Sequence, residues 1–216
     1  MVNRKFQIGV LAFCIMLFST SMIAQTQKWK DAKTKDGKIS TKYKISSRTN
    51  ENGEDVPLIE MVTTAIEKIS IDKCIALARN VSRHKDFHGD DSSNLVKVIS
   101  DHEWVLYYYT EGTLFSPDAD GVYTMTFNED PLGKIASFRI EAAPTLVEER
   151  GVKRVTYLNE TFTFKDLGNG LIQITMTSNM SPAFQVPGWI LKMSFPDLAF
   201  KVMENFIKLA HDEQSK

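Results

Sequence analysis

The chain has 216 residues, of which 43% are hydrophobic and 25% are charged. This composition is ordinary for a soluble globular protein and excludes disordered, collagen-like, coiled-coil and multi-span membrane classes. The 26 Lys and Arg residues nearly balance the 27 Asp and Glu residues, so the formal net charge is -1. No long block of like charge is present, and nucleic acid is therefore not an expected partner.

The first 24 residues have the pattern of a secretory signal peptide. Arg4 and Lys5 precede an apolar run over residues 6–18, and small polar residues follow before Ala24. This pattern predicts cleavage after Ala24 and a secreted or periplasmic protein whose single domain spans residues 25–216. The alternative is an uncleaved membrane anchor through residues 6–24, a stretch near the lower limit of spanning length.

Cleavage at that point would remove Cys14 and leave Cys74 as the only thiol. An intramolecular disulfide could then not form, so the hydrophobic core alone would have to hold the fold. Cys74 is predicted to be buried on a helix face and therefore unreactive.

The first part of the domain combines strand and helix patterns. Residues 29–36 are polar and are compatible with one or two helical turns. Polar and apolar residues alternate over 39–46, and residues 56–68 are rich in strand-forming types, which predicts two strands. Ser70 is an N-cap candidate for an amphipathic helix that runs to about His88.

A period of two returns after Gly89. It predicts six strands with short connections, over residues 95–100, 103–110, 122–128, 134–141, 152–165 and 171–178. Consecutive strands with short loops indicate an antiparallel meander rather than a parallel sheet.

The last predicted element is a long helix that begins at Pro196. On a helical wheel its apolar residues fill an arc of roughly 200°, about twice the width that a helix resting on a flat layer needs. These residues are Leu198, Ala199, Phe200, Val202, Met203, Phe206, Ile207, Leu209 and Ala210. A curved sheet is expected to embrace such a helix, so the predicted class is α+β, an antiparallel sheet wrapped around a C-terminal helix.

This order of elements resembles the StAR-related lipid-transfer (START) domain of the helix-grip superfamily, in the form of a bacterial secreted START-like protein. The resemblance covers residues 29–209. Its landmarks are Trp29 with Lys35-Asp36-Gly37-Lys38-Ile39, the helix over 70–87, and Pro187-Gly188-Trp189-Ile190-Leu191. START-like sequences often carry an Arg-Asp pair and a Trp-Pro segment in the mid-domain loop, and residues 115–122 depart from that pattern.

The resemblance implies an apolar cavity between the sheet and the last helix that binds, and in a further step transfers, a lipid, a sterol or another hydrophobic molecule. The residues expected to bind the ligand are Tyr107, Tyr109, Met125, Phe138, Met176, Trp189, Met193, Met203, Phe206 and Ile207. Thioethers adapt to the shape of a ligand, and a tyrosine hydroxyl in an apolar space needs a partner that a ligand could supply. For each of these residues an ordinary position in the core or on a sheet face is the alternative.

The loop over residues 112–121 is expected to act as a gate at the cavity mouth, with Leu114-Phe115 as a hydrophobic tip for transient membrane contact. Asp118, Asp120 and Gly121 resemble part of a calcium loop. An EF-hand would need an acid at its twelfth position, where this chain has Phe127, so a tight turn is expected instead.

His84 and His88 are spaced i, i+4 on the predicted helix, with His102 farther along the chain. A zinc site is conceivable, but the glutamate of an HExxH motif is missing and the spacing provides no third ligand. We therefore expect solvated histidines near a helix end, with no metal and no cofactor, and chemistry at the cavity mouth as the alternative.

No nucleophile elbow, phosphate loop or dinucleotide fingerprint occurs in the sequence, so no catalytic residue is predicted and the protein is not expected to be an enzyme. The alternative is a cyclase-type or hydrolase-type enzyme that acts on a hydrophobic substrate in the same cavity. His102, Glu103 and Tyr107 are candidates for it, although their spacing does not bring them together. A third alternative is a filled domain used for protein contacts. A monomer is expected.

Overall fold

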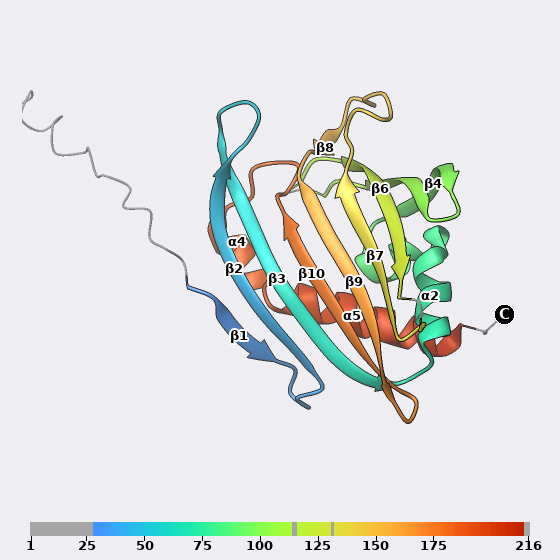
Figure 1. Cartoon of the computed structure of the whole chain (residues 1–216). Coiled ribbons are helices and arrows are strands. Elements are labelled where there is room, and N and C mark those ends of the chain that lie inside the picture. Colours follow the sequence, from blue (N-terminus) through green and yellow to red (C-terminus); the bar gives the residue numbers. More distant parts are fainter. Residues whose placement is uncertain (1–27, 114–115, 131, 214–216) are drawn as a thin grey trace, which may run out of the picture.

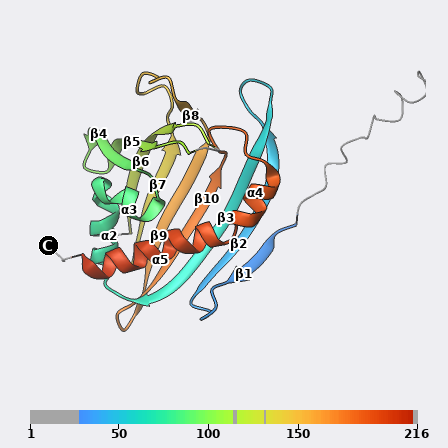
Figure 2. The ribbon, with the colours of Figure 1, turned by 180° about the vertical axis from the view of Figure 1, so that it is seen from behind.

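The computed structural model describes residues 28–113, 116–130 and 132–213. Within these residues, one ten-stranded sheet curves around a C-terminal helix (Figure 1; Figure 2). This arrangement confirms the predicted α+β class and the predicted helix-grip architecture. The expected signal peptide over residues 1–24 lies outside the described residues.

All ten strands belong to one sheet, in which an early strand of the chain pairs with the last one. Its strands are β1 (Lys30–Lys33), β2 (Ile39–Thr49), β3 (Asp55–Lys68), β4 (Ser92–Ser100), β5 (Glu103–Thr110), β6 (Ala119–Glu129), β7 (Ile135–Ala142), β8 (Lys153–Val155), β9 (Leu158–Gly168) and β10 (Leu171–Met180). The order across the sheet is β1-β2-β3-β10-β9-β7-β6-β5-β4, with β8 beside β6. Because β3 pairs with β10, the early strands extend the meander that the later strands form.

Helices cover one face of the sheet (Figure 2). They are α2 (Ile71–Arg79), the 3-10 turn η2 (Val81–Arg83), α3 (His84–His88), α4 (Gly188–Ser194) and α5 (Asp197–Asp212). Ser70 caps α2, as predicted, by accepting a hydrogen bond from the Lys73 backbone N–H at 3.4 Å. Within the described ranges, no helix has the length and apolar character needed to cross a membrane.

The helix predicted to run to His88 is interrupted at Asn80. The backbone of Asn80 leaves the helical region, and its side-chain oxygen accepts a hydrogen bond from the Ser82 hydroxyl at 2.8 Å. Asparagine favours such local bonds over a continuous helix. A further turn then forms α3, which ends at Gly89 in the left-handed conformation, with φ of +92°.

One predicted helical stretch and one predicted strand were wrong. Residues 30–33 form β1 at the sheet edge, paired with β2, where helical turns were expected. The single strand predicted over 152–165 is divided into β8 and β9, because β8 pairs in parallel with β6. Arg154 on β8 forms a buried ion pair with Asp120 on β6 at 2.7 Å and so ties the two strands together.

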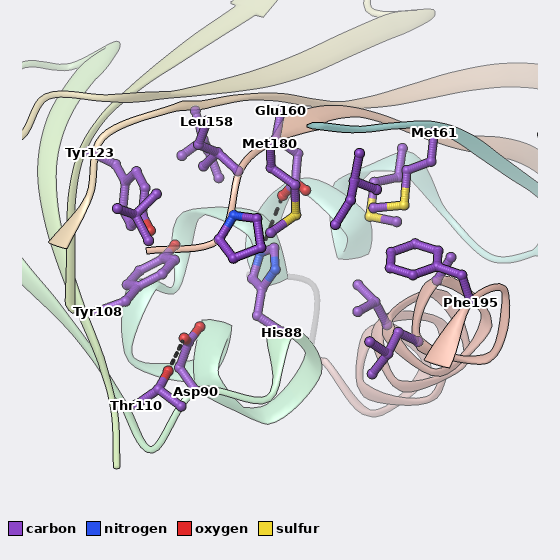
Figure 3. A pocket seen from close by; sticks show the side chains of 18 of the residues that line it. Met61, His88, Asp90, Tyr108, Thr110, Tyr123, Leu158, Glu160, Met180 and Phe195 are labelled. Atoms are coloured by element: carbon purple, nitrogen blue, oxygen red, sulfur yellow. Dashed lines mark hydrogen bonds and ion pairs between the residues drawn. The ribbon is translucent and has the colours of Figure 1, made fainter. Parts of the chain in front are cut away.

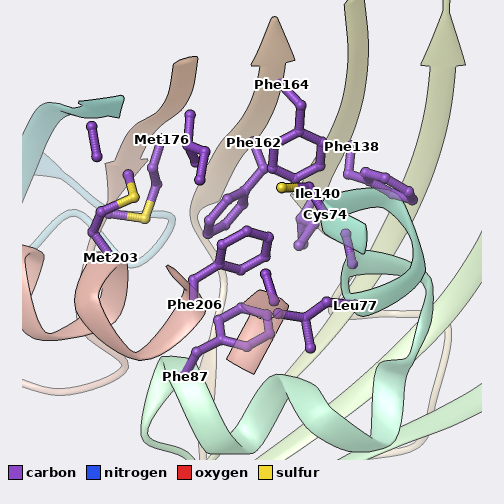
Figure 4. Packing of buried hydrophobic residues seen from close by; sticks show 14 of the residues in the cluster. Cys74, Leu77, Phe87, Phe138, Ile140, Phe162, Phe164, Met176, Met203 and Phe206 are labelled. Carbon is purple, nitrogen blue, oxygen red and sulfur yellow. The ribbon is translucent and has the colours of Figure 1, made fainter. Parts of the chain in front are cut away.

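The core lies between the concave face of the sheet and helices α2, α3 and α5 (Figure 4). The Phe206 ring is fully buried, 5.3 Å from the Phe162 ring and 5.5 Å from the Phe164 ring, between ring centroids. Phe87 meets it edge-on at 5.2 Å. Cys74 is fully buried as predicted, and burial raises its thiol pKa to about 12, so it is unreactive at neutral pH.

Candidate functional site

A cavity of about 370 Å³ opens at the other end of the concave face, between the sheet and helices α3, α4 and α5 (Figure 3). Its volume is near the lower end of the range of about 300–1,000 Å³ that is usual for small-molecule pockets. Most of its walls are apolar. The apolar lining consists of Ile59, Met61, Ile140, Val155, Leu158, Met176, Met180, Pro182, Leu191, Phe195, Leu198, Ala199 and Val202.

Strand periodicity places many of these side chains on one face. Residues two or four apart in a strand point to the same side, as Met176 and Met180 do on β10. The register sets Ser178, which lies between them, opposite Glu160 on β9 and Met61 on β3. Glu160 is therefore the acidic member of a cross-strand row that also contains Met61, Ser178 and Ile140.

A group of polar residues forms one end of the cavity, and we call it the polar cluster: His88, Asp90, Tyr108, Tyr123 and Glu160. They come from α3 and the turn after it, from β5, from β6 and from β9. Figure 3 shows the tyrosines, Asp90 and His88 on one side of the cavity, away from Phe195 and Met61. The arrangement is that of a largely apolar pocket with a few convergent polar groups.

His84 lies behind the polar cluster and orients Tyr108. Its Nε2 is 2.8 Å from the backbone carbonyl of Ala78, and a carbonyl only accepts, so Nε2 carries the proton. Its Nδ1 must then accept the hydrogen bond that the Tyr108 hydroxyl donates. Burial lowers the pKa of His84 to about 4, so the ring is neutral at physiological pH.

His88 and Glu160 lie next to each other at the polar end of the cavity. Glu160 is 5% exposed, and its Oε1 lies 3.6 Å from Nε2 of His88, which is longer than a hydrogen bond. Burial, with a smaller contribution from Asp90, raises the pKa of Glu160 to about 7, while the nearby Ser178 hydroxyl acts in the opposite direction. Burial and the proximity of His84 lower the pKa of His88 to about 3. Burial therefore disfavours the charged form of both side chains; His88 is neutral near pH 7, and Glu160 ionises only as the pH rises through about 7.

Asp90 is placed by the turn that ends α3. Gly89 adopts a left-handed conformation there, which a residue with a Cβ would enter only with strain. The Asp90 carboxylate accepts a hydrogen bond from the Thr110 hydroxyl at 2.9 Å. Burial nevertheless raises its pKa to about 6, and the adjacent Asp91 adds to this effect.

Tyr123 owes its place in the cavity wall to Gly121. A Cβ built on Gly121 would lie 1.9 Å from the Tyr123 hydroxyl oxygen. Because the two residues are two apart on β6, their side chains point to the same face, and only glycine leaves room for the phenol ring.

Among the residues predicted to bind a ligand, Met176 lines the cavity. Met125, Phe138, Met203 and Phe206 are fully buried in the packed part of the core, and Ile207 is half-buried against it. Trp189 and Met193 lie on α4 with 63% and 74% of their surface exposed.

The two predicted tyrosines lie away from the cavity, and the tyrosine between them lines it. Tyr107 packs on the opposite face of β5 with Val105 and Val122. Tyr109 donates a hydrogen bond to Asp118 at the surface, at 2.8 Å. Both faces of β5 are covered over this stretch, so hydrophobic patterning could not distinguish them. Gly121 and Tyr123 are two apart on one strand and so share a face, but the sequence does not show that the phenol ring lies over Gly121.

The expectation of solvated histidines was wrong for His84 and His88, which are largely enclosed because α3 packs its inner face against α5 and the sheet. Asp118 accepts hydrogen bonds from the Gly112 N–H and from the Tyr109 hydroxyl, but Asp120 and Gly121 lie in strand β6, so the tight turn expected at these residues was wrong. No group of His, Cys, Asp or Glu in the described part of the chain is arranged to hold a metal ion.

The remaining candidates are the tip of the expected gate loop and the residues proposed for the enzyme alternative. The proposed tip over residues 114–115 lies outside the described residues. The His102 ring stacks on Phe127 at 5.7 Å, whereas Tyr107 packs on the outer face of β5. The structure therefore does not bring together the set proposed for the enzyme alternative.

No family model matches the sequence, and no curated protein matches it. Solved structures do match. A STAR-related lipid transfer protein from Xanthomonas axonopodis is 21% identical, with a TM-score of 0.68 over 85% of this chain and 98% of that chain. Human STARD10 is 12% identical, with a TM-score of 0.66 over 98% of this chain and 81% of that one. The Zhui aromatase/cyclase from Streptomyces sp. R1128 is 10% identical, with a TM-score of 0.50 over 71% and 94%. The chain thus has the START-like helix-grip fold.

Proposed function

We propose that the protein binds one hydrophobic small molecule in the cavity between the sheet, α4 and α5. The observation that carries this proposal is the cavity of about 370 Å³, apolar except for the polar cluster at one end. Apolar ligand surface that leaves water contributes roughly 25 cal/mol per Å² to binding. The volume favours a single-chain or compact ligand over a two-chain phospholipid. The similarity in fold to lipid transfer proteins supports the same function.

A titration with the uncharged fluorescent probe N-phenyl-1-naphthylamine tests the proposal. We expect saturable binding of one probe per chain. Val202 lines the cavity from α5, so Val202→Trp would fill it and abolish binding. Ile207→Trp is the matched control, since Ile207 is a half-buried residue of the same helix that does not line the cavity. Equal probe binding by both variants would contradict the proposed site.

Transfer to and from a membrane would require an exit, and α4 is the candidate. Leu191 lines the cavity from this helix, while Trp189 and Met193 are largely exposed. Leu198, at the start of α5, lines the cavity and is 50% exposed. Exposed aromatic and apolar side chains beside a cavity are suited to shallow contact with a lipid surface.

Vesicle co-sedimentation tests this route. Trp189→Glu together with Met193→Glu should reduce vesicle binding and slow ligand exchange, with equilibrium binding in the cavity unchanged. Leu132→Glu is the control, because Leu132 is equally exposed but lies in the turn between β6 and β7. Exchange rates unaffected by the α4 substitutions would exclude α4 as the exit.

An enzyme in the same cavity is the second candidate, and the polar cluster is the observation that favours it. Neutral His88 and the raised pKa of Glu160 are properties of acid–base groups. A similar fold occurs in an aromatase/cyclase. Mass analysis of a bound ligand before and after prolonged incubation separates the two functions: a binding protein returns it unchanged, and an enzyme converts it at a rate that Glu160→Gln abolishes.

We also propose that the protein is secreted or periplasmic and that it is a monomer. The proposed location rests on the sequence pattern of residues 4–24. Cell fractionation and N-terminal sequencing of the mature protein test it. An intact N-terminus in the membrane fraction would favour the anchor instead.

A further inference from the structure

Resting on the proposed binding function, we propose that the ligand is an apolar molecule that carries a protonated amine, with its ammonium group bound by Glu160 and Asp90 at the polar end of the cavity. The inference goes beyond hydrophobic binding because it assigns a charge and a hydrogen-bonding type to the ligand. Three features of the polar cluster support it: its excess of acceptors, its lack of a compensating cation and the unpartnered buried Nε2 of His88.

Hydrogen-bond acceptors predominate in the polar cluster. Asp90 and Glu160 present carboxylate oxygens, and the proton of the Thr110 hydroxyl is already donated to Asp90. Tyr108 donates its proton to His84, whose Nε2 proton is held by the Ala78 carbonyl. Toward the cavity the Tyr108 oxygen can therefore only accept. The Tyr123 hydroxyl adds one donor, but acceptors remain in excess, and a ligand group that complements this wall should mainly donate.

The negative charges have no compensating partner in the wall. Among the described residues that line the cavity there is no Lys and no Arg. The contact of Glu160 with His88 at 3.6 Å is too long for a hydrogen bond, and His88 is neutral. A buried carboxylate without a paired cation is unfavourable, and this cost is relieved when a cation enters. The raised pKa values of Glu160 and Asp90 express the same imbalance in the empty cavity.

Nε2 of His88, beside Glu160 in the cavity wall, has no hydrogen-bond partner among the described residues. Buried polar atoms are rarely left unpaired in native proteins. An ammonium group offers three N–H donors and a positive charge, whereas an alcohol offers one donor and a carboxylate offers none. The amine is thus the head group that the wall matches best.

Competition with three ligands of equal chain length tests the inference. Dodecylamine, dodecanol and dodecanoate would each displace N-phenyl-1-naphthylamine from the wild-type protein at about pH 8, where a primary amine is still protonated. We expect dodecylamine to bind at least about tenfold more tightly than dodecanol, since hydrogen bonds to charged groups contribute about 1.5–3 kcal/mol. Dodecanoate should bind most weakly, because the carboxylates repel it.

Glu160→Gln should remove the preference for the amine, so that dodecylamine and dodecanol bind with similar affinities. Glu141→Gln is the control, because Glu141 is exposed on β7 and does not line the cavity. Should Glu160→Gln fail to fold, Asp90→Asn should reduce the same preference. Equal binding of amine and alcohol by the wild type, or tighter binding of dodecanoate, would overturn the inference and leave the proposed function intact. A wild-type protein that binds neither the probe nor any of the three would refute both.

Discussion

The two ends of the groove beneath α5 are built from the same helix and the same sheet, yet one is packed and the other is hollow. At the packed end, Phe206 of α5 fills the space against Phe162 and Phe164. At the hollow end, α5 presents Leu198, Ala199 and Val202, none of them aromatic, to the cavity. The backbone architecture therefore does not by itself create the cavity. The size of the side chains that α5 directs at each end, together with packing from α2 and α3 at the Phe206 end, decides which end has room for a ligand.

Truncation at the packed end should have the largest effect on stability. Phe206→Ala is expected to lower the free energy of unfolding by about 3–5 kcal/mol, because it opens a void in a close-packed cluster. Val202→Ala, at the hollow end, should cost far less, since its side chain already borders empty space. Urea unfolding of both variants measures the contrast. Similar losses would mean that the two ends are equally packed.

At the polar end, the buried Glu160 carboxyl group should make the free energy of unfolding depend on pH. The pKa of Glu160 is raised in the folded state from 4.5 to about 7, so the folded protein binds more protons than the unfolded chain between these values. Stability from this group is present below pH 4.5 and is lost as the pH rises through about 7. Glu160→Gln should therefore stabilise the protein at pH 8 by on the order of 2–3 kcal/mol.

The stabilisation by Glu160→Gln relative to the wild type should be much smaller at about pH 5, where the buried carboxyl is already protonated. Asp90, His84 and His88 titrate in both proteins, so the difference between the two proteins reports Glu160 together with its coupling to Asp90. Glu141→Gln, on the exposed face of β7, should show no such pH-dependent gain. Destabilisation by Glu160→Gln at pH 8 would mean that the carboxylate is well paired after all.

The hydrogen bond from the Tyr108 hydroxyl to Nδ1 of His84 should contribute less to the free energy of unfolding. Tyr108→Phe leaves the buried Nδ1 of His84 without its donor and is expected to cost about 1–2 kcal/mol. Tyr109→Phe is the adjacent control, because its hydroxyl bonds to Asp118 at the surface. Thermal unfolding compares the two. An equal cost for both would argue against a buried His84–Tyr108 bond.

The smallest effect is expected where the polar end is shaped by a single glycine. Gly121→Ala would place a methyl group against the Tyr123 hydroxyl and force the buried ring to move in the cavity wall. Stability should fall by about 1 kcal/mol, and the affinity for N-phenyl-1-naphthylamine should change a few-fold. Unchanged affinity would show that Tyr123 does not shape the binding space.

Much of the fold could be predicted from the sequence, because it depends on patterns that are local. The wide apolar arc of the last helix predicted a sheet curved around it, and all of that arc except Leu198 is buried or half-buried in α5. The Ser70 cap and the antiparallel meander also followed from local signals. The break at Asn80 did not, because the periodicity of Ile71 to Val81 continues through it.

The candidate site was less predictable, because a period of two indicates a face of the sheet and not a position along the groove. Met125, Phe138 and Met176 all face the helices, but the first two lie in the packed core and Met176 borders the cavity. His88 and Glu160 are 72 positions apart in the numbering and meet only when α3 packs against β9. No spacing rule connects them.

Native mass spectrometry of the protein after incubation with a lipid extract of its own host tests the central claim most directly. The account predicts one bound hydrophobic molecule per wild-type chain, lost in Val202→Trp and retained in Ile207→Trp. An empty wild-type protein, or a bound molecule that Val202→Trp does not displace, would contradict it.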